Sequence, residues 1–192
     1  PRHRERSGAG DHGHDQPARG FSAGCGTRAL GRGLGMSAGG AALQLVMFVL
    51  DGQRFAFPLA AVQRVLSMVA PAPLPEAPPI ALGVINLHGL IVPVLDLRRR
   101  LGLPPREYGP ADRLVVARSS RRLLAIPVDE ALGVMEVMMD SIVPPETIFP
   151  GIGRVAGVAP LADGLLFIHD LDSFLSLDEE QGLTAALEAQ QG

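Results

Sequence analysis

The sequence predicts a mainly β protein built as two small five-stranded barrels packed together, with short helical turns and a C-terminal helix. Two observations carry this prediction. Short apolar segments separated by turn residues run through residues 43–103 and 113–177, and the second group repeats the order of the first. Five short strands with an apolar face would leave two exposed edges in a flat sheet, so each unit is expected to curl into its own barrel.

The first unit opens with a β-hairpin. The apolar run LQLVMFVL ends at Asp51-Gly52, a dipeptide that favours a type I′ turn because both central residues of that turn have positive φ. The run QRFAFPL then returns with Phe55 and Phe57 on one face. A shorter strand is expected over residues 62–68, before a proline-rich loop.

The stretch GVINLHGLIVPVLDLRRRLGL, residues 83–103, predicts a second hairpin with His88-Gly89 at its tip. Pro93 lies in the returning strand and has no N–H to donate to a ladder. The strand that contains it is therefore expected to be an edge strand or to contain a bulge.

Two helical segments are predicted from their capping residues. Asp96 can N-cap a short helix in which residues 98–100, all arginine, mostly point outward. Ser176 and Glu179 have the spacing of a capping box, and apolar residues at helical spacing follow. A C-terminal helix over 179–192 is the expectation.

The second unit repeats the first. GVINLHGLIVPVLDLRRRLGL aligns without a gap over GVAPLADGLLFIHDLDSFLSL, residues 157–177, and the shared positions include Gly83/Gly157 and the capping pair Asp96/Asp170. Upstream, FAFPLAAVQRV aligns with LAIPVDEALGV. A proline-containing connector, LPPREYGPAD, joins the two units.

Composition argues against several classes of protein. The formal net charge is -3, aromatic residues make up 4% of the chain and tryptophan is absent, so nucleic-acid binding is not predicted. No apolar run is long enough to cross a bilayer, so no direct membrane insertion is predicted. A single cysteine, Cys25, agrees with a cytoplasmic location.

The first 40 residues differ from the rest of the chain. Residues 1–40 are rich in glycine and arginine and poor in large apolar side chains, which predicts a disordered tail. The Asp and His residues within 11–15 lack a rigid frame, so no metal site is predicted there. Met36, followed by small residues, is interpreted as the start of translation; an intact mass that includes residues 1–35 would contradict this hypothesis.

No catalytic or cofactor-binding site is predicted. The chain contains no nucleophile elbow, phosphate loop, H-E-x-x-H or C-x-x-C motif. His169 and Asp170, with Ser173 or Ser176 nearby, resemble a triad in composition, but neighbouring strand residues point to opposite faces and Asp170 is expected to cap a helix.

The remaining polar and flexible residues fit structural roles or a docking module. Asp129 and Glu130 are interpreted as a solvated turn. Met135, Met138 and Met139 are interpreted as core residues, with an adaptable contact surface as the alternative. Sheet edges, small apolar patches and a few charges near turns are the usual materials of a docking module.

GVINLHGLIVPVLDL resembles the signature of CheW-like domains, usually written G-V-[IT]-N-L-R-G-x-I-[IV]-P-[IV]-x-D-L. The resemblance continues in FAFPLAAVQRVL, LLAIPVDEALGVMEV and DGLLFIHDLDSFLS, and it places the domain at about residues 41–178. It implies two five-stranded SH3-like barrels. It also implies a non-enzymatic, cytoplasmic adaptor, recruited to membrane-receptor arrays, that joins methyl-accepting chemoreceptors to a CheA-type histidine kinase.

The resemblance also implies a receptor-binding groove and kinase contacts at the barrel ends. The groove residues, carried over by position, are Val62, Arg64, Val65, Gly83, Asn86 and His88. The family usually has arginine where this chain has His88 and often an acidic residue where it has Arg64, so a typical arginine–carboxylate pair is missing here. Partner carboxylates that pair with Arg64 and an altered receptor specificity are both open interpretations.

Two other functions remain as alternatives. A CheW-like scaffold of a non-flagellar pathway, such as surface motility or second-messenger control, would agree with the changed charges. A small-barrel ligand-binding protein would require a pocket with convergent polar groups and a shifted pKa.

Overall fold

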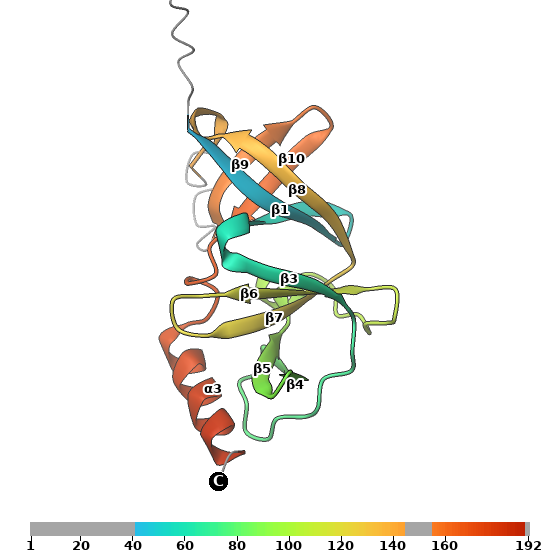
Figure 1. Ribbon diagram of the computed structural model, residues 1–192, viewed down its shortest axis with the longest axis vertical. Coiled ribbons are helices and arrows are strands. Elements are labelled where there is room, and N and C mark those ends of the chain that lie inside the picture. The colour runs from blue at the N-terminus through green and yellow to red at the C-terminus, as the bar shows by residue number, and fades with distance from the viewer. Residues whose placement is uncertain (1–40, 145–154, 191–192) are drawn as a thin grey trace, which may run out of the picture. The chain divides into compact units, whose positions relative to one another are not determined.

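The computed structural model describes residues 41–144 and 155–190, in which ten strands form two five-stranded sheets (Figure 1). The predicted tail and the proposed start at Met36 lie outside the described residues. The mainly β prediction is confirmed. In chain order the strands are β1 (Ala42–Leu50), β2 (Gln53–Pro58), β3 (Val62–Ser67), β4 (Ala81–Leu87), β5 (Leu90–Leu95), β6 (Arg113–Arg118), β7 (Leu123–Val128), β8 (Glu130–Met138), β9 (Val155–Leu161) and β10 (Gly164–His169).

Within residues 41–144 and 155–190, the helical elements are short except for the last one. They are the 3₁₀ helices η1 (Leu59–Ala61) and η2 (Met139–Ser141), and the α-helices α1 (Leu97–Leu101) and α3 (Leu177–Ala189). Asp96 caps α1 as predicted, accepting a hydrogen bond from the Arg99 N–H. The capping box between Ser176 and Glu179 is formed in both directions. The helical turn expected after Asp170 is not formed, because its carboxylate accepts from the Asp172 N–H and stabilises a turn instead.

The two sheets show that the sequence repeat extends to the topology. Their strand orders are β8-β1-β2-β10-β9 and β3-β6-β7-β5-β4. The orders become identical when each strand of one unit is replaced by its counterpart in the other. Each sheet takes the first hairpin from one unit and the last three strands from the other unit. The prediction that each unit closes its own barrel is therefore wrong: the two units exchange strands.

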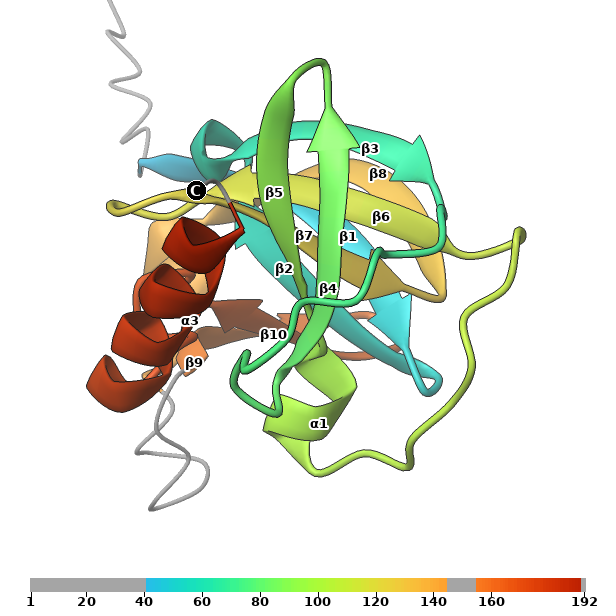
Figure 2. The same cartoon turned by 90° about the horizontal axis from the view of Figure 1, so that it is seen from below.

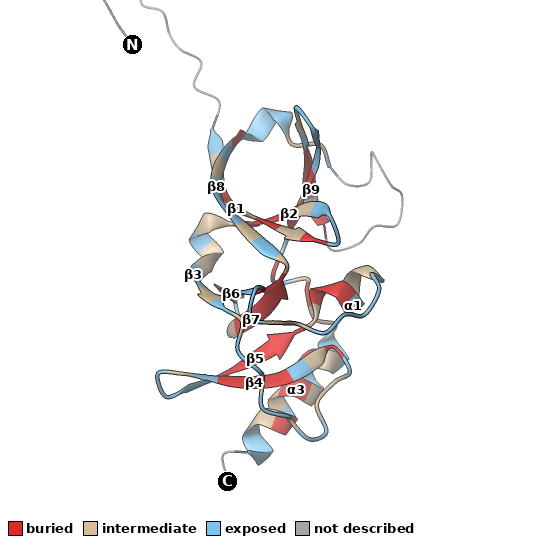
Figure 3. Cartoon of the chain, turned by 90° about the vertical axis from the view of Figure 1, so that its right-hand side faces the viewer, coloured by how far each residue is buried: buried red, intermediate tan, exposed pale blue. Residues whose placement is uncertain are grey.

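Strands β1, β2, β6 and β7 are buried on both faces, and this burial explains the exchange. Inside the first barrel lie Leu45 and Ala56, and inside the second lie Leu114 and Val116. The opposite faces of the same strands form one shared cluster between the barrels, whose largest members include Phe48, Phe57, Leu124 and Ile126. Figure 3 shows the first sheet nearly end-on as a ring. The first hairpin of each unit thus supplies both a barrel wall and a part of the shared core.

Helix α3 packs against the second barrel, as Figure 2 shows. Leu183 of α3 enters the shared cluster. The Arg100 guanidinium lies 2.5 Å from the Glu179 carboxylate, and Arg122 donates to the Thr184 hydroxyl. Side chains from α1 and from the β6–β7 turn therefore fix the position of the helix on the barrel.

Pro93 lies in an interior strand, so the edge-strand alternative is wrong. The other alternative, a bulge, is not found in β5 itself, because the irregularity of the β4–β5 ladder falls on β4, between Ala81 and Gly83. Strand β5 has β4 on one side and β7 on the other, but its parallel ladder with β7 contains a single residue pair, Val94 with Ala125. In the other barrel Phe167 occupies the position of Pro93, and the equivalent ladder contains three pairs. The missing N–H is thus accommodated by shortening the parallel ladder.

Candidate functional site

The six predicted groove residues lie on the two edge strands of the second sheet. Val62, Arg64 and Val65 are on β3, whereas Gly83 and Asn86 are on β4 and His88 is in the turn after it. The chain that leaves β3 pairs back onto β4, with mutual backbone hydrogen bonds of 2.8 Å between Ala72 and Val84. This bridge connects the two edges, so all six residues belong to one barrel.

Two of the six residues have structural tasks that account for their residue types. Gly83 is buried with φ 141°, and a Cβ there would collide with the backbone oxygen of Ala72. Asn86 accepts a hydrogen bond from the Gly89 N–H at 2.7 Å and thereby fixes the hairpin turn. Close approach of two backbones therefore explains the glycine, and turn formation explains the asparagine.

The other four residues supply the accessible chemistry. Arg64 and His88 are exposed, and Val65 is 39% exposed. Val62 is half-buried and packs against the shared core. His88 has φ 52° in the turn that it forms with Gly89, which holds its side chain at the hairpin tip. The surface thus offers one cation, one imidazole and one apolar side chain.

The internal repeat identifies a second candidate contact residue, which the sequence analysis did not include. Strand β3 carries a bulge between Val62 and Arg64, and β8 carries the equivalent bulge in its pairing with β1. By register, Val134 on β8 is the counterpart of Val65, and it is also exposed. The apolar character of β8, together with the repeat, was the available signal for this second edge.

The methionines divide between core and surface. Met135 packs against the core of the first barrel, as predicted. Met138 and Met139 are exposed, so the core interpretation is wrong for them. Met138 is the last residue of β8 and Met139 begins η2, so the alternative of a contact surface fits these two exposed side chains better.

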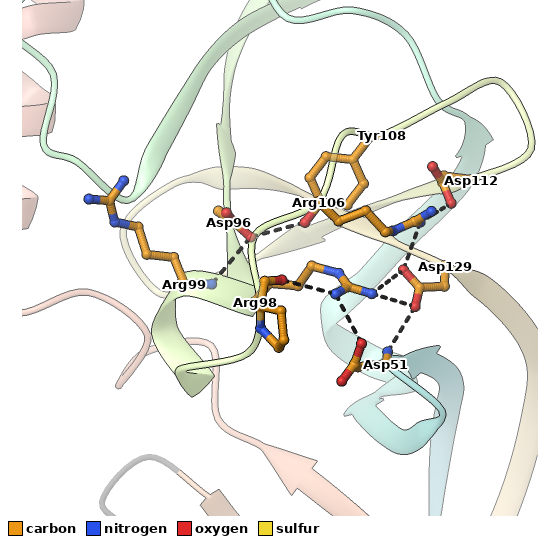
Figure 4. A network of polar contacts seen from close by, with 9 residues as sticks. Asp51, Asp96, Arg98, Arg99, Arg106, Tyr108, Asp112 and Asp129 are labelled. Carbon is orange, nitrogen blue, oxygen red and sulfur yellow. Dashed lines mark hydrogen bonds and ion pairs between the residues drawn. The ribbon is translucent and has the colours of Figure 1, made fainter.

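A buried polar network joins the connector to both barrels (Figure 4). Arg98 of α1 does not point outward as expected: its side chain is 3% exposed, and Nη2 donates to both carboxylate oxygens of Asp129 at 2.7 and 3.0 Å. Nη1 donates to the Pro104 carbonyl and, at 3.4 Å, to Asp51. Asp129 is therefore an ion-pair partner in the network, and the interpretation of a solvated turn is wrong for it.

Arg106 and Tyr108 of the connector complete this network. The Arg106 guanidinium bridges Asp112 and Asp129, and the Tyr108 hydroxyl donates to Asp96 at 2.9 Å. Burial alone would raise the pKa of the Asp129 carboxyl, but hydrogen bonds from Arg98 and the Asp51 N–H outweigh it and lower the pKa. Burial, reinforced by the Asp96 charge, raises the pKa of Tyr108. The opposite charges of the network therefore compensate one another, although the buried Nε of Arg98 has no hydrogen-bond partner within the described residues.

A cavity of about 500 Å³ lies beside the two sheet edges. Its lining consists of Met68, Ala70, Pro71, Leu82, Arg106, Glu107, Tyr108, Gly109 and Pro110. The Tyr108 hydroxyl and the Arg106 guanidinium are both engaged in the network just described. The shifted pKa of Tyr108 thus comes from the network, and the cavity does not present the convergent polar groups that a small-ligand site requires.

The residues that resembled a triad are not arranged as one. His169 is buried, with its ring 5.6 Å from that of Phe55. The Ser173 hydroxyl donates to the backbone carbonyl of Asp170, and Ser176 caps α3. Within residues 41–144 and 155–190, no group of three or more His, Cys, Asp or Glu side chains could hold a metal ion. No helix in that part of the chain is long and apolar enough to cross a membrane.

Comparison with known proteins identifies the family. The chain is 28% identical to the chemotaxis protein CheW of Rhizobium meliloti over 140 residues, which cover 72% of this chain and 90% of the relative. It is 33% identical to the protein FrzA of Myxococcus xanthus over 98 residues, covering 51% of this chain and 61% of FrzA.

A solved structure and a family model agree with these relatives. The crystal structure of the scaffolding protein TtCheW from Thermoanaerobacter tengcongensis matches with a TM-score of 0.66 and 26% identity, covering 72% of this chain and 96% of the other. The two five-stranded barrels are thus the SH3-like barrels implied by the resemblance. The family model of the CheW-like domain matches residues 44–179. The chain belongs to the CheW-like domain family.

Proposed function

We propose that this protein is a non-enzymatic adaptor that couples the cytoplasmic tips of chemoreceptors to a CheA-type histidine kinase. The observation that carries the proposal is the match to the CheW-like domain across both barrels. The names of the R. meliloti and T. tengcongensis relatives, a chemotaxis protein and a scaffolding protein, support it. The protein then works in the cytoplasm and is recruited to receptor arrays.

In this proposal the receptor docks on the β3 and β4 edges. Val65 offers apolar area, and Arg64 and His88 offer polar contacts beside it. The exposed Val134 on the repeat-related edge of the first barrel offers a second apolar side chain to partners. The kinase's own CheW-like domain meets the barrel ends, with one contact on each unit.

The adaptor would act through geometry. A receptor movement changes the activity of the kinase only if the adaptor binds two arrangements of receptor and kinase with different free energies. Such differences are typically about 1 to 3 kcal/mol. Weak contacts repeated across an array would multiply this effect. The shared core between the barrels supports such a role, because it links the two docking surfaces through packed side chains.

The test is a reconstitution with the receptor tip and the CheA-type kinase of the organism that encodes this chain. Val65→Asp should abolish receptor-stimulated kinase phosphorylation while kinase binding and the far-UV spectrum stay unchanged. Leu177→Asp is the control, because Leu177 is exposed at the first position of α3 and lies outside the β3 and β4 edges. Val62 and Gly83 are unsuitable, since one packs on the core and the other contacts the backbone of Ala72.

The outcomes separate the parts of the proposal. Failure to bind either the kinase or the receptor would refute the adaptor function. Normal stimulation by Val65→Asp would refute the assigned groove.

A scaffold for a non-flagellar pathway is the second candidate. The similarity to FrzA, a relative whose name is not that of a chemotaxis protein, and the changed residues Arg64 and His88 favour it. Deletion of the gene distinguishes the two candidates. Loss of swimming bias supports the flagellar system, whereas unchanged swimming with a defect in surface movement supports the second candidate.

A further inference from the structure

The charge of the proposed receptor surface is one-sided. Residues 62–73 and 81–91, which form the two sheet edges, the bridge between them and the hairpin tip, contain Arg64 and His88 but no acidic residue. Arg64 is exposed and forms no ion pair within the described part of the chain. A guanidinium presents a planar fork of donors that suits a carboxylate. The molecule itself leaves this fork available to a partner.

The fold does not require this positive charge. By register, Gly133 is the counterpart of Arg64, and Ala162 is the counterpart of His88 in the second hairpin. The first barrel forms the same bulge and an equivalent bridge, Val143 with Val158, without either charge. Residues 130–141 even carry three acids, Glu130, Glu136 and Asp140, and no basic residue. An edge strand of this geometry therefore forms with basic residues in one barrel and with acidic residues in the other. The fold does not need an arginine at position 64 to form the strand.

Two simpler roles for Arg64 are protection of the sheet edge and an ion pair within the molecule. A charge on an edge strand can prevent edge-to-edge aggregation, but a glutamate or a lysine would serve that purpose equally well. An internal partner could be Glu107, which lines the cavity together with Met68 and Leu82. No ion pair between Glu107 and Arg64 is formed within the described residues.

We propose that the chemoreceptor segment that docks on the β3 and β4 edges carries a carboxylate that pairs with Arg64. This inference rests on the proposed adaptor function and specifies the chemistry of its receptor partner. The pairing selects receptors by charge, because a tip with a basic or neutral residue at that point leaves Arg64 desolvated without a partner. Arg64 is then a specificity-determining residue of this adaptor.

The experiment measures binding of the full chain to a chemoreceptor cytoplasmic-tip fragment from the organism that encodes it. Arg64→Glu should weaken binding by at least about tenfold, and Arg64→Lys by less, since lysine keeps the charge but loses the fork. Arg121→Glu makes the same change in net charge at an exposed position in the β6–β7 turn, and it should leave binding unchanged.

A charge exchange identifies the partner residue. Each acidic residue of the fragment is changed in turn to arginine, and one of these changes should restore binding to Arg64→Glu while weakening binding to the unmodified chain. The same affinity for the unmodified chain and Arg64→Glu would overturn this inference and leave the adaptor function standing. Failure of the unmodified chain to bind any receptor tip would overturn both.

Discussion

The Arg98–Asp129 pair should stabilise the fold far more than the chemically similar Arg54–Asp163 pair, because only the first is shielded from water. The side chains of Arg98 and Asp129 are 3% and 24% exposed, compared with 34% and 64% for Arg54 and Asp163. Both arginines use two contacts to their carboxylate. The two pairs therefore compare the same chemical groups in a shielded network and at an exposed site.

The expected loss of unfolding free energy depends on the contacts that remain to the unpaired charge in each variant. Asp129→Asn leaves a buried guanidinium with the Pro104 carbonyl at 3.2 Å and Asp51 at 3.4 Å, and should cost about 3 kcal/mol. Arg98→Met should cost less, about 2 kcal/mol, since Arg106 and water still reach the carboxylate of Asp129. The double variant should therefore cost less than the sum of the single changes.

Urea unfolding followed by circular dichroism gives the free energy of unfolding for each member of the cycle. The equivalent cycle, with Arg54→Met and Asp163→Asn, is the control and should show a clearly smaller coupling that falls with added salt. A coupling for the exposed pair that equals or exceeds that of the buried pair would refute the reasoning. Unchanged m-values are required for the comparison, because they show that the unfolded state is the same.

Three further predictions concern acid and backbone geometry. The pKa of Asp129 is lower in the folded protein than its usual value of 3.8. Its carboxylate therefore stabilises the fold above pH 3.8, and this stabilisation is lost as the pH falls through the pKa of the folded state. The difference in unfolding free energy between the unmodified chain and Asp129→Asn should be smaller at about pH 3 than at about pH 6. Gly83→Ala should lower the melting temperature more than Gly157→Ala, because the added Cβ meets the backbone of Ala72 in the first case and a side-chain methyl in the second; equal losses would contradict this. His88→Asn should raise stability by roughly 0.5 kcal/mol in thermal unfolding, since asparagine tolerates positive φ better at this turn, and a lower melting temperature would count against the strain argument.

Features with a local chemical cause could be predicted from the sequence. Asp51-Gly52 has φ values of 53° and 74°, as the dipeptide implied. The caps formed by Asp96 and Ser176 depend on side chains within three residues of the N–H groups that they accept from. Turns and caps are visible in a sequence because the interacting groups are neighbours along the chain.

Features that depend on distant residues were missed. Arg98 lies in a run of three arginines, and nothing local distinguishes it from Arg99 and Arg100. Its partners Asp129 and Asp51 are 31 and 47 residues away along the chain, and only the tertiary structure brings them to it. The groove residues illustrate the same limit, since the sequence could not separate the packing role of Gly83 from the accessibility of Arg64.

The exchange of strands between the units is the largest departure from the sequence prediction, and it bears on the proposed function. Two units that each closed a barrel would be joined by one connector and a surface contact, and relative domain motion would be expected. Here each barrel contains strands of both units, the first hairpins are buried on both faces, and the polar network fixes the connector. An adaptor must keep two partners in a defined geometry for a small movement of one to reach the other. Strand exchange meets this requirement, because the chain crosses between the barrels twice, from β2 to β3 and from β7 to β8, and both first hairpins pack one face into the core that the barrels share.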